Sequence, residues 1–392
     1  MRRFMILVVA LICAAQMFCV PAEAATSSSS SSLGTSNPTG DLSAAITQIT
    51  GIAISPLLGI GAVGAVKYFR ADAATRPKLP WFAQPWFFAP ALLLVAVCFL
   101  KDTAGVAVPT ALKKPLDLAE VFENKVSGLI ATGAIVPIAY SAFQAFDKTT
   151  SSLDGSSFAA IDLSPVYNVL MVPVALAVYA VVWLVSHTIN ILILISPFSS
   201  VDAALKSFRT AILSSVVLSH WFSDTLGLLW AGVIILVCAL LSGWAFRLLV
   251  YGNTIAWDLV SFHSRRLQFK GGSAVTFLAR KWAGVPVRTR GKIERNAGGT
   301  LVFTYRPWLV LPVRSIELPA GRYAIGRGVL HPSLILLDGV EDSDVANFPP
   351  RFSSHESALA EVSGATEIRD TGIRAAWSWL KGCFGGNTTA TA

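Results

Sequence analysis

The residues that could carry chemistry in this chain are a small set of acidic and histidine side chains within very apolar sequence. Four of the acidic ones lie in the stretch 99–128, interleaved with lysines, and four further candidates follow. In chain order the set is Asp102, Asp117, Glu120, Glu123, His187, Asp202, His220 and Asp224. Ionisable groups retained within membrane spans usually line a cavity or pair with each other. The set is therefore predicted to mark a polar pathway.

The acidic residues each allow two interpretations. Asp102 follows Lys101 at the end of an apolar segment. It is either half of an interfacial ion pair or a cation or proton site that faces the interior of a helix bundle. Asp117, Glu120 and Glu123 are spaced by three and share one helix face. That face is either solvated beside lipid headgroups or forms a vestibule that attracts cations.

The histidines are equally open to two interpretations. His187 lies deep in an apolar segment, where Asn190 or Ser186 could satisfy its ring, or where it could relay protons. His220 and Asp224 are four residues apart. They could form an acid–imidazole pair that shuttles protons, or they could anchor a helix end.

Signatures of catalysis and of cofactor binding are missing from the sequence. No Ser-His-Asp order with a nucleophile elbow is present. Gly321, Gly326 and Gly328 lack the Lys-Ser/Thr of a phosphate-binding loop, and we interpret them as turns. The cysteines have neither disulfide nor metal-ligand spacing; they are Cys13, Cys19, Cys98, Cys238 and Cys383. We therefore expect no metal, no cofactor and no enzymatic activity.

Composition indicates a membrane protein. The chain has 392 residues, of which 54% are hydrophobic and only 14% charged, whereas soluble domains carry about 25% charged residues. The bilayer is the natural solvent for so many apolar side chains. The net charge is +8, with the basic excess after Arg247. A basic cytoplasmic flank explains this excess more simply than nucleic-acid binding does.

The N-terminus has the pattern of an exported protein. Arg2 and Arg3 precede an apolar run, and Ala22-Glu23-Ala24 offers a small-x-small cleavage site. Residues 1–24 are therefore predicted to be a signal peptide, with an uncleaved anchor helix as the alternative. Residues 25–43 form a serine-rich linker.

Residues 44–250 are predicted to be a transmembrane helical domain with five spans. The expected spans are 44–66, 80–100, 126–146, 166–198 and 225–246. The first carries Gly51, Ser55 and Gly59 at intervals of four, which predicts close packing against a neighbouring helix, with a lined cavity as the alternative. In the fourth, Pro173 predicts a tilted or broken helix.

Charge distribution sets the expected orientation. The loop after the first span is basic, with Lys67, Arg70, Arg76 and Lys78. By the positive-inside rule it is cytoplasmic, which places the mature N-terminus outside and, after five spans, the C-terminus inside. The predicted location is the inner (cytoplasmic) membrane.

The character of the chain changes after the last span. Residues 251–284 read as a basic amphipathic junction, and 285–365 as a small β-rich cytoplasmic domain, barrel-like or sandwich-like. A helix is expected at 352–362, with Ser353 or Ser354 as its N-cap. The tail, 366–392, either lies on the membrane surface or frays.

Part of the chain resembles a known bacterial membrane family. Gly51-Ile52-Ala53-Ile54-Ser55-Pro56-Leu57-Leu58-Gly59 resembles the opening helix of the domain of unknown function numbered four-one-two-six. That family has a tryptophan-rich second helix, then an acidic segment, then a basic residue and a glycine that open the next helix. The residues at these places here are Trp81 and Trp86, Asp102 and Asp117, and Lys125 and Gly128. The resemblance covers residues 44–146 and extends loosely to 247. It implies an integral membrane fold and no particular activity.

The expected fold is thus a membrane all-α bundle with polar kinked or re-entrant segments, followed by a C-terminal β-rich domain. The predicted function is that of a small-solute or ion transporter or channel-like protein. The alternative is a non-transporting anchor or scaffold that presents a cytoplasmic regulatory domain. The expected partner is the lipid bilayer. The pattern also allows a homo-oligomer and a protein partner that binds residues 285–365. No nucleic acid is expected as a partner.

Overall fold

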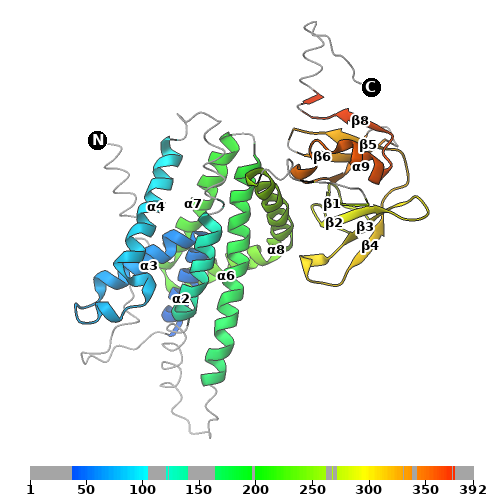
Figure 1. Ribbon diagram of the computed structural model, residues 1–392. Helices are drawn as coiled ribbons and strands as arrows, with labels where there is room; N and C mark the ends of the chain where they lie inside the picture. The colour runs from blue at the N-terminus through cyan, green and yellow to red at the C-terminus, as the bar shows by residue number, and fades with distance from the viewer. Residues whose placement is uncertain are drawn as a thin grey trace. The chain divides into compact units, whose positions relative to one another are not determined.

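The chain folds into a helical unit followed by a β unit. The computed structural model describes residues 38–104, 121, 123–139, 164–196, 199–261, 267, 272–329, 331–337, 342–372 and 374–375. It divides the chain into two compact units, Met1–Ala245 and Phe246–Ala392. The expectation of a helical region followed by a β domain is confirmed (Figure 1). The predicted signal peptide 1–24 lies outside the described residues, as does the linker 25–43 up to residue 37.

The helical unit is a bundle of helices. It contains α2 (Pro38–Ile54), α3 (Pro56–Arg70), α4 (Pro85–Ala104), a helix over 123–139, α6 (Ser164–Ile195) and α7 (Ser199–Phe222). Helix α8 (Asp224–Val260) begins in this unit, and its last residues, from Phe246, belong to the second. Short 3₁₀ turns, η2 (Arg76–Lys78) and η3 (Trp81–Ala83), connect α3 to α4.

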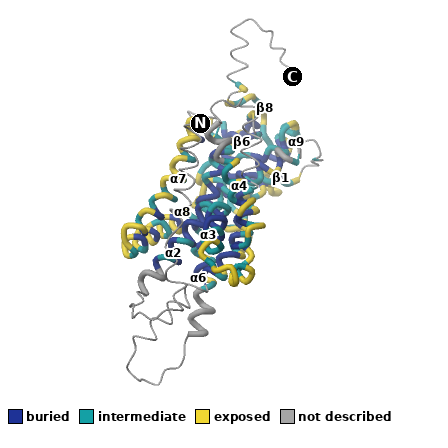
Figure 2. Tube along the Cα trace, turned by 90° about the vertical axis from the view of Figure 1, so that its left-hand side faces the viewer, coloured by how far each residue is buried: buried dark blue, intermediate teal, exposed yellow. Residues whose placement is uncertain are grey.

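The apolar core of the helical unit comes from its central helices. Ile52 on α2, Ile60 on α3, Phe82 on η3 and Ile135 on the 123–139 helix are all fully buried in one cluster, which α6 joins through Tyr179. Buried positions gather around α2 and α3, while exposed ones follow the outer helices (Figure 2). These central helices therefore enclose the buried polar groups described below.

Two expected helices differ from prediction. The first span, 44–66, is not one helix, because the chain leaves helical geometry at Ser55 (φ −139°, ψ 86°) and restarts at Pro56. Proline has no N–H to donate and its ring clashes with the preceding turn, which explains the interruption. In the fourth span, α6 instead runs unbroken through Pro173.

The interruption changes how the small residues of the first span pack. Gly51, Ser55 and Gly59 do not form one straight face. Instead Gly59 lies against Ile52 of α2, where an added Cβ would be 2.7 Å from the Ile52 Cα. Close packing through a small residue is present, but it joins the two halves of the broken helix.

Among the described residues, two helical segments are long and apolar enough to cross a membrane. They are Val172–Ile195 in α6 and Asp224–Asp258 in α8. Large apolar side chains stand exposed along α8: Leu226, Leu229, Trp230, Val233, Leu236, Val237, Leu240, Leu241 and Trp244. An exposed apolar surface of this length is what contact with lipid requires.

The second unit is built on one mixed eight-stranded sheet. Its strands are β1 (Ser273–Leu278), β2 (Arg290–Arg295), β3 (Leu301–Tyr305), β4 (Arg314–Glu317), β5 (Tyr323–Arg327), β6 (Pro332–Leu336), β7 (Ser343–Asn347) and β8 (Glu367–Asp370). Their order is β4-β3-β2-β1-β7-β6-β5-β8. All neighbours are antiparallel except β5 and β8, which are parallel.

The sheet extends beyond the predicted domain and is not a two-sheet sandwich. Strand β1 falls in the expected junction 251–284, and β8 in the expected tail. Within the sequence 308–318, only the second half forms a strand, β4, because η5 (Pro307–Leu309) and an exposed loop take the first half. Gly326, interpreted above as a turn residue, lies within β5, where an added Cβ would come 2.7 Å from the Ser333 Oγ.

Helix α9 (Glu356–Ser363) packs on this sheet and touches β1, β2, β5 and β8. The predicted N-cap at Ser353 or Ser354 is wrong, because His355 holds that position without a side-chain hydrogen bond. Glu356 does accept a hydrogen bond from the backbone N–H of Ser354 (3.2 Å). Gly364 ends the helix in the left-handed conformation (φ 64°), as glycine readily does.

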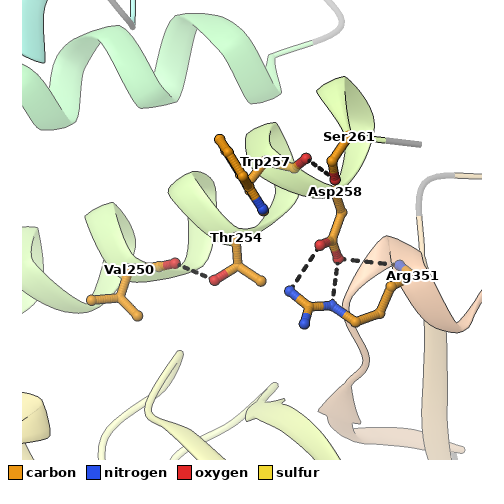
Figure 3. Close-up of polar contacts among 6 residues, drawn as sticks. All are labelled: Val250, Thr254, Trp257, Asp258, Ser261 and Arg351. Atoms are coloured by element: carbon orange, nitrogen blue, oxygen red, sulfur yellow. Dashed lines mark hydrogen bonds and ion pairs between the residues drawn. The ribbon is translucent and has the colours of Figure 1, made fainter. Parts of the chain in front are cut away.

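The end of α8 is fixed to the β domain by two polar contacts. The Asp258 carboxylate, fully buried, accepts hydrogen bonds from the Arg351 backbone N–H and Nε and lies 2.8 Å from Nη2 (Figure 3). Two turns earlier, the Tyr251 hydroxyl lies 3.0 Å from Nε2 of His331. The His331 Nδ1–H donates to the Pro332 carbonyl, so Nε2 accepts from Tyr251.

Candidate functional site

The strongest candidate site in the helical unit is the interruption between α2 and α3. The Ser55 N–H still bonds to the Gly51 carbonyl (3.1 Å), and the Gly59 N–H bonds to the Ser55 carbonyl (2.8 Å). Between these two turns, the Ile54 carbonyl is used by side chains from other helices. Interrupted helices with redirected carbonyls are how many transporters build ion and solute sites.

Three side-chain donors converge on the Ile54 carbonyl. It accepts from the Ser186 hydroxyl of α6 (2.7 Å) and from Nε (3.0 Å) and Nη2 (2.7 Å) of Arg209 on α7. The third guanidinium nitrogen, Nη1, donates to Oδ1 of Asn190 (3.0 Å). Arg209 therefore links the broken helix to α6, and the interruption is surrounded by hydrogen-bond donors.

His187 lies beside this cluster and is fully buried, with no exposed surface. Neither ring nitrogen has a hydrogen-bond partner among the described residues. The expectation that Asn190 or Ser186 satisfies the ring is wrong: Ser186 is bonded to Ile54, and the Asn190 oxygen to Arg209. The imidazole stacks instead on Trp183 (5.2 Å between ring centres).

Further buried polar atoms without a partner in the described part of the chain occur on α2 and α6. They are the hydroxyls of Thr47 and Thr50 on α2, and Nε1 of Trp183 and Nδ2 of Asn190 on α6. Thr47, Thr50 and Ile54 are spaced by three and four, so they lie along one face of α2. An unmade buried hydrogen bond costs about 1–3 kcal/mol. Such groups call for an explanation, and water or a bound solute is one.

A second polar cluster joins the start of the bundle to the turn between α7 and α8. Nδ1 of His220 lies 3.1 Å from the Ser43 Oγ and 3.5 Å from Oδ1 of Asp224. The Ser43 hydroxyl donates to the Asp224 carbonyl (2.7 Å). His220 and Asp224 lie close enough to pair, with His220 near the end of α7 and Asp224 at the start of α8.

This second cluster is not arranged as a catalytic triad. A triad uses the two imidazole nitrogens for different partners, one for the nucleophile and one for the acid. Here Ser43 and Asp224 both face Nδ1. Because the Ser43 hydroxyl already donates elsewhere, Nδ1 carries the ring hydrogen, and the arrangement anchors two helix ends.

Of the remaining predicted pathway residues, the structure describes Glu123 and Asp202, and Asp102 only in its backbone. Asp102 lies near the end of α4, with its side chain outside the described set, and Asp117 and Glu120 lie outside the described residues altogether. Glu123 is half-buried at the start of the 123–139 helix, and Asp202 is buried in the first turn of α7. Within the described residues, no group of three or more His, Cys, Asp or Glu could hold a metal ion.

Sequence reasoning missed the two groups at the centre of the site. Arg209 was not among the predicted site residues, and the Ile54 carbonyl cannot be seen in a side-chain pattern. The usable signal was Ser55-Pro56 in the middle of an apolar run. A proline there indicates a break, although it does not tell which side chains will meet the freed backbone.

Comparison with protein-family models, with curated proteins and with solved structures found no match for this chain.

Proposed function

We propose that this chain is an integral membrane protein whose helical unit conducts or transports a small solute or ion. The interruption at Ile54 carries the proposal. It combines a redirected backbone carbonyl with Arg209 and with the unpartnered nitrogens of His187. A protein that only needed a stable bundle would gain by replacing a buried imidazole without partners by an apolar side chain.

The donor set favours an anionic or uncharged solute. Arg209, the Asn190 amide and the threonine hydroxyls are all hydrogen-bond donors. The positive charges of Lys125 and Arg209 also act on His187. A cation would meet this charge unfavourably, whereas a small anion or a polar neutral molecule would be stabilised.

The proposal includes the topology expected from the sequence. It has five spans, a cleaved signal peptide, an outer N-terminus and a cytoplasmic β domain in the inner membrane. Support comes from the two apolar segments of α6 and α8 and from the exposed apolar side chains on α8. Kinship with the family of domain four-one-two-six over residues 44–146 is part of the same proposal, as is assembly into a homo-oligomer.

Solvent access to His187 tests the proposal. In a chain with its cysteines replaced, His187→Cys in native membranes is treated with a charged, membrane-impermeant thiol reagent. A wet pathway predicts labelling at this position. Val182→Cys, on the same helix and in the apolar core, is the matched control and should stay unlabelled. Equal protection of both positions from both membrane faces would contradict the pathway.

Flux through the purified protein is the second test. Proteoliposomes are assayed with chloride, nitrate, glycerol and urea as probes. His187→Leu should abolish flux of the accepted probe without lowering thermal stability, because the ring makes no hydrogen bond that the leucine would lose. Unchanged flux together with a less stable protein would show that His187 is a packing residue.

A second candidate function is that of a membrane anchor for the β domain. The observation that favours it is the pair of contacts joining α8 to the domain. Asp258 pairs with Arg351 (Figure 3), and Tyr251 is hydrogen-bonded to His331. Such a joint fixes the domain to the end of a candidate span. The anchor predicts no flux and no labelling at His187, so the same two tests separate the candidates.

A further inference from the structure

The loop between β3 and β4 exposes an unusual run of apolar side chains. Residues 307–313 read Pro-Trp-Leu-Val-Leu-Pro-Val, between Arg306 and Arg314. Trp308, Leu309, Leu311 and Val313 are all exposed, and Val310 is 80% exposed. Contiguous exposed apolar residues at a loop tip mark an interaction site rather than a random surface.

The backbone of this loop holds an unfavourable conformation. Trp308 (φ 53°) and Leu309 (φ 63°) are consecutive residues in the left-handed region. Large side chains rarely adopt this conformation, because the Cβ crowds the backbone. Backbone strain of this kind is retained mainly where function requires it. Here the two residues stand at the start of the exposed apolar run.

Neighbouring residues indicate what the tip meets. The Trp308 ring packs on Phe246 of α8, with 4.9 Å between ring centres. Phe246 lies two residues after Trp244, where the exposed apolar run of α8 ends, and the next residue is Arg247. Arg306 and Arg314 are both exposed at the base of the loop. Aromatic and basic residues at the end of an apolar helix are typical of the membrane–water interface.

We propose that the β3–β4 loop inserts into the surface of an anionic bilayer. Val310 and Leu311 enter the boundary between headgroups and acyl chains, Trp308 lies at headgroup level, and Arg306 and Arg314 bind lipid phosphates. The inference rests on the part of the proposed function that places α8 across the membrane, and is independent of transport.

A protein partner fits this surface less well. Pairing with another strand would use the edge of β4, but that strand exposes Arg314, Ser315 and Glu317. Charged side chains on an edge strand oppose strand addition. The apolar part is instead a short tip flanked by two cations, which matches a negatively charged interface better than a flat protein surface.

Depth measurements on the full-length chain test the proposal. The protein, with its cysteines replaced, is placed in nanodiscs of phosphatidylcholine and phosphatidylglycerol. A nitroxide label is attached at Val310→Cys, Val329→Cys or Leu240→Cys. Val329 is the matched control, a valine 64% exposed in the β5–β6 loop of the same domain, and Leu240 reports on α8. Collision rates with oxygen, which enters lipid, and with a water-soluble nickel chelate are compared.

Insertion predicts that the labels at 310 and 240 collide mainly with oxygen and the label at 329 mainly with nickel. A nickel-accessible label at 310 with an embedded label at 240 overturns the loop insertion alone. A nickel-accessible label at 240 overturns the membrane location of α8. A label at 310 shielded from both reagents indicates a protein cover and also overturns the proposal.

The arginines are tested in the same assay. Changing Arg306→Gln together with Arg314→Gln should lower the ratio of oxygen to nickel collisions at position 310 severalfold. Arg327→Gln, an exposed arginine on β5, is the control and should leave the ratio unchanged. An unaltered ratio in the double variant would contradict the binding of lipid phosphates by Arg306 and Arg314.

Discussion

At the scale of single residues, glycines decide how closely the helices of the first unit approach. Gly64 on α3 lies against the backbone of η3, where an added Cβ would come 2.1 Å from the Phe82 carbonyl oxygen. On α8, Gly227 packs against the His220 backbone, where a Cβ added to Gly227 would be 2.7 Å from the His220 Cα. Gly232, on the same helix, has nothing within 4 Å of that position. Glycines in similar sequence thus serve different purposes.

We predict opposite effects of alanine at two of these positions. Gly64→Ala should destabilise the protein by about 1–3 kcal/mol, because a backbone carbonyl must move. Gly232→Ala should be neutral or should stabilise by up to about 1 kcal/mol through helix propensity. Thermal unfolding in detergent, followed by tryptophan fluorescence, measures both. Equal effects at the two positions would contradict the close packing of α3 on η3.

His331 gives the β domain an expected response to pH. Burial lowers the pKa of His331 below its ordinary value of 6.5, partly offset by the hydrogen bond to Pro332 and by the charge of Asp344. The unfolded chain therefore binds a proton that the folded chain does not. Its contribution to stability is complete above the unfolded pKa and is lost as the pH falls below about 6.5.

The corresponding prediction compares the wild type with His331→Asn. Between about pH 7.5 and about pH 5.5, the wild type should lose more thermal stability than the variant, which has no titrating ring at this position. The melting temperature of the β domain at the two pH values is the measurement. A variant with the same pH-dependent loss as the wild type would show that other groups control the response.

At the scale of elements, the connection between α8 and the sheet depends on a buried ion pair. The Asp258 side chain has no exposed surface, whereas 20% of the Arg351 side chain is exposed. The two ends of the pair are therefore unequal. Removing the arginine leaves a buried carboxylate without a cation, whereas removing the carboxylate leaves a cation that can reach water.

We expect Arg351→Ala to destabilise the β unit by about 3–5 kcal/mol, the usual cost of leaving a buried charge unpaired. Asp258→Asn should have a smaller effect. The control is Arg369→Ala, which breaks the exposed pair with Asp342 and should change stability by less than about 1 kcal/mol. Urea unfolding of the full chain in detergent measures all three. If Asp258→Asn destabilised the protein more than Arg351→Ala, the buried carboxylate would not be the group that depends on its partner.

At the scale of the whole molecule, the division into two units predicts where the chain can be cut. Strand β1 pairs with both β2 and β7, so it lies in the interior of the sheet. A cut after residue 284 would leave β1 attached to the helices without these partners. A cut after residue 271 removes the whole sheet.

Residues 1–271 alone should therefore remain in the membrane, resistant to alkaline extraction, and should be monodisperse in detergent. Residues 1–284 should insert equally well but aggregate more, because β1 exposes unpaired edges. Membrane fractionation and size-exclusion chromatography measure these outcomes. A 1–271 fragment that fails to insert would contradict the independence of the helical unit.

The sequence alone predicted the properties that depend on neighbouring residues. The apolar run 225–246 predicted a membrane helix, and the segment 285–365 predicted a β-rich domain after it, because hydropathy and propensity act locally. Local signals also misled: Pro173 suggested a break that α6 does not have. A proline within a helix is tolerated where tertiary packing compensates for the missing hydrogen bond.

Only the tertiary structure decided the site and the edges of the sheet. The partners of the Ile54 carbonyl lie 132 and 155 residues away along the chain. The isolation of His187 and the exposure of Val310 depend equally on what other segments leave uncovered. Hydrogen bonding and burial at Ile54, His187 and Val310 depend on residues far away in the chain. The spacing of residues within one segment therefore cannot predict them.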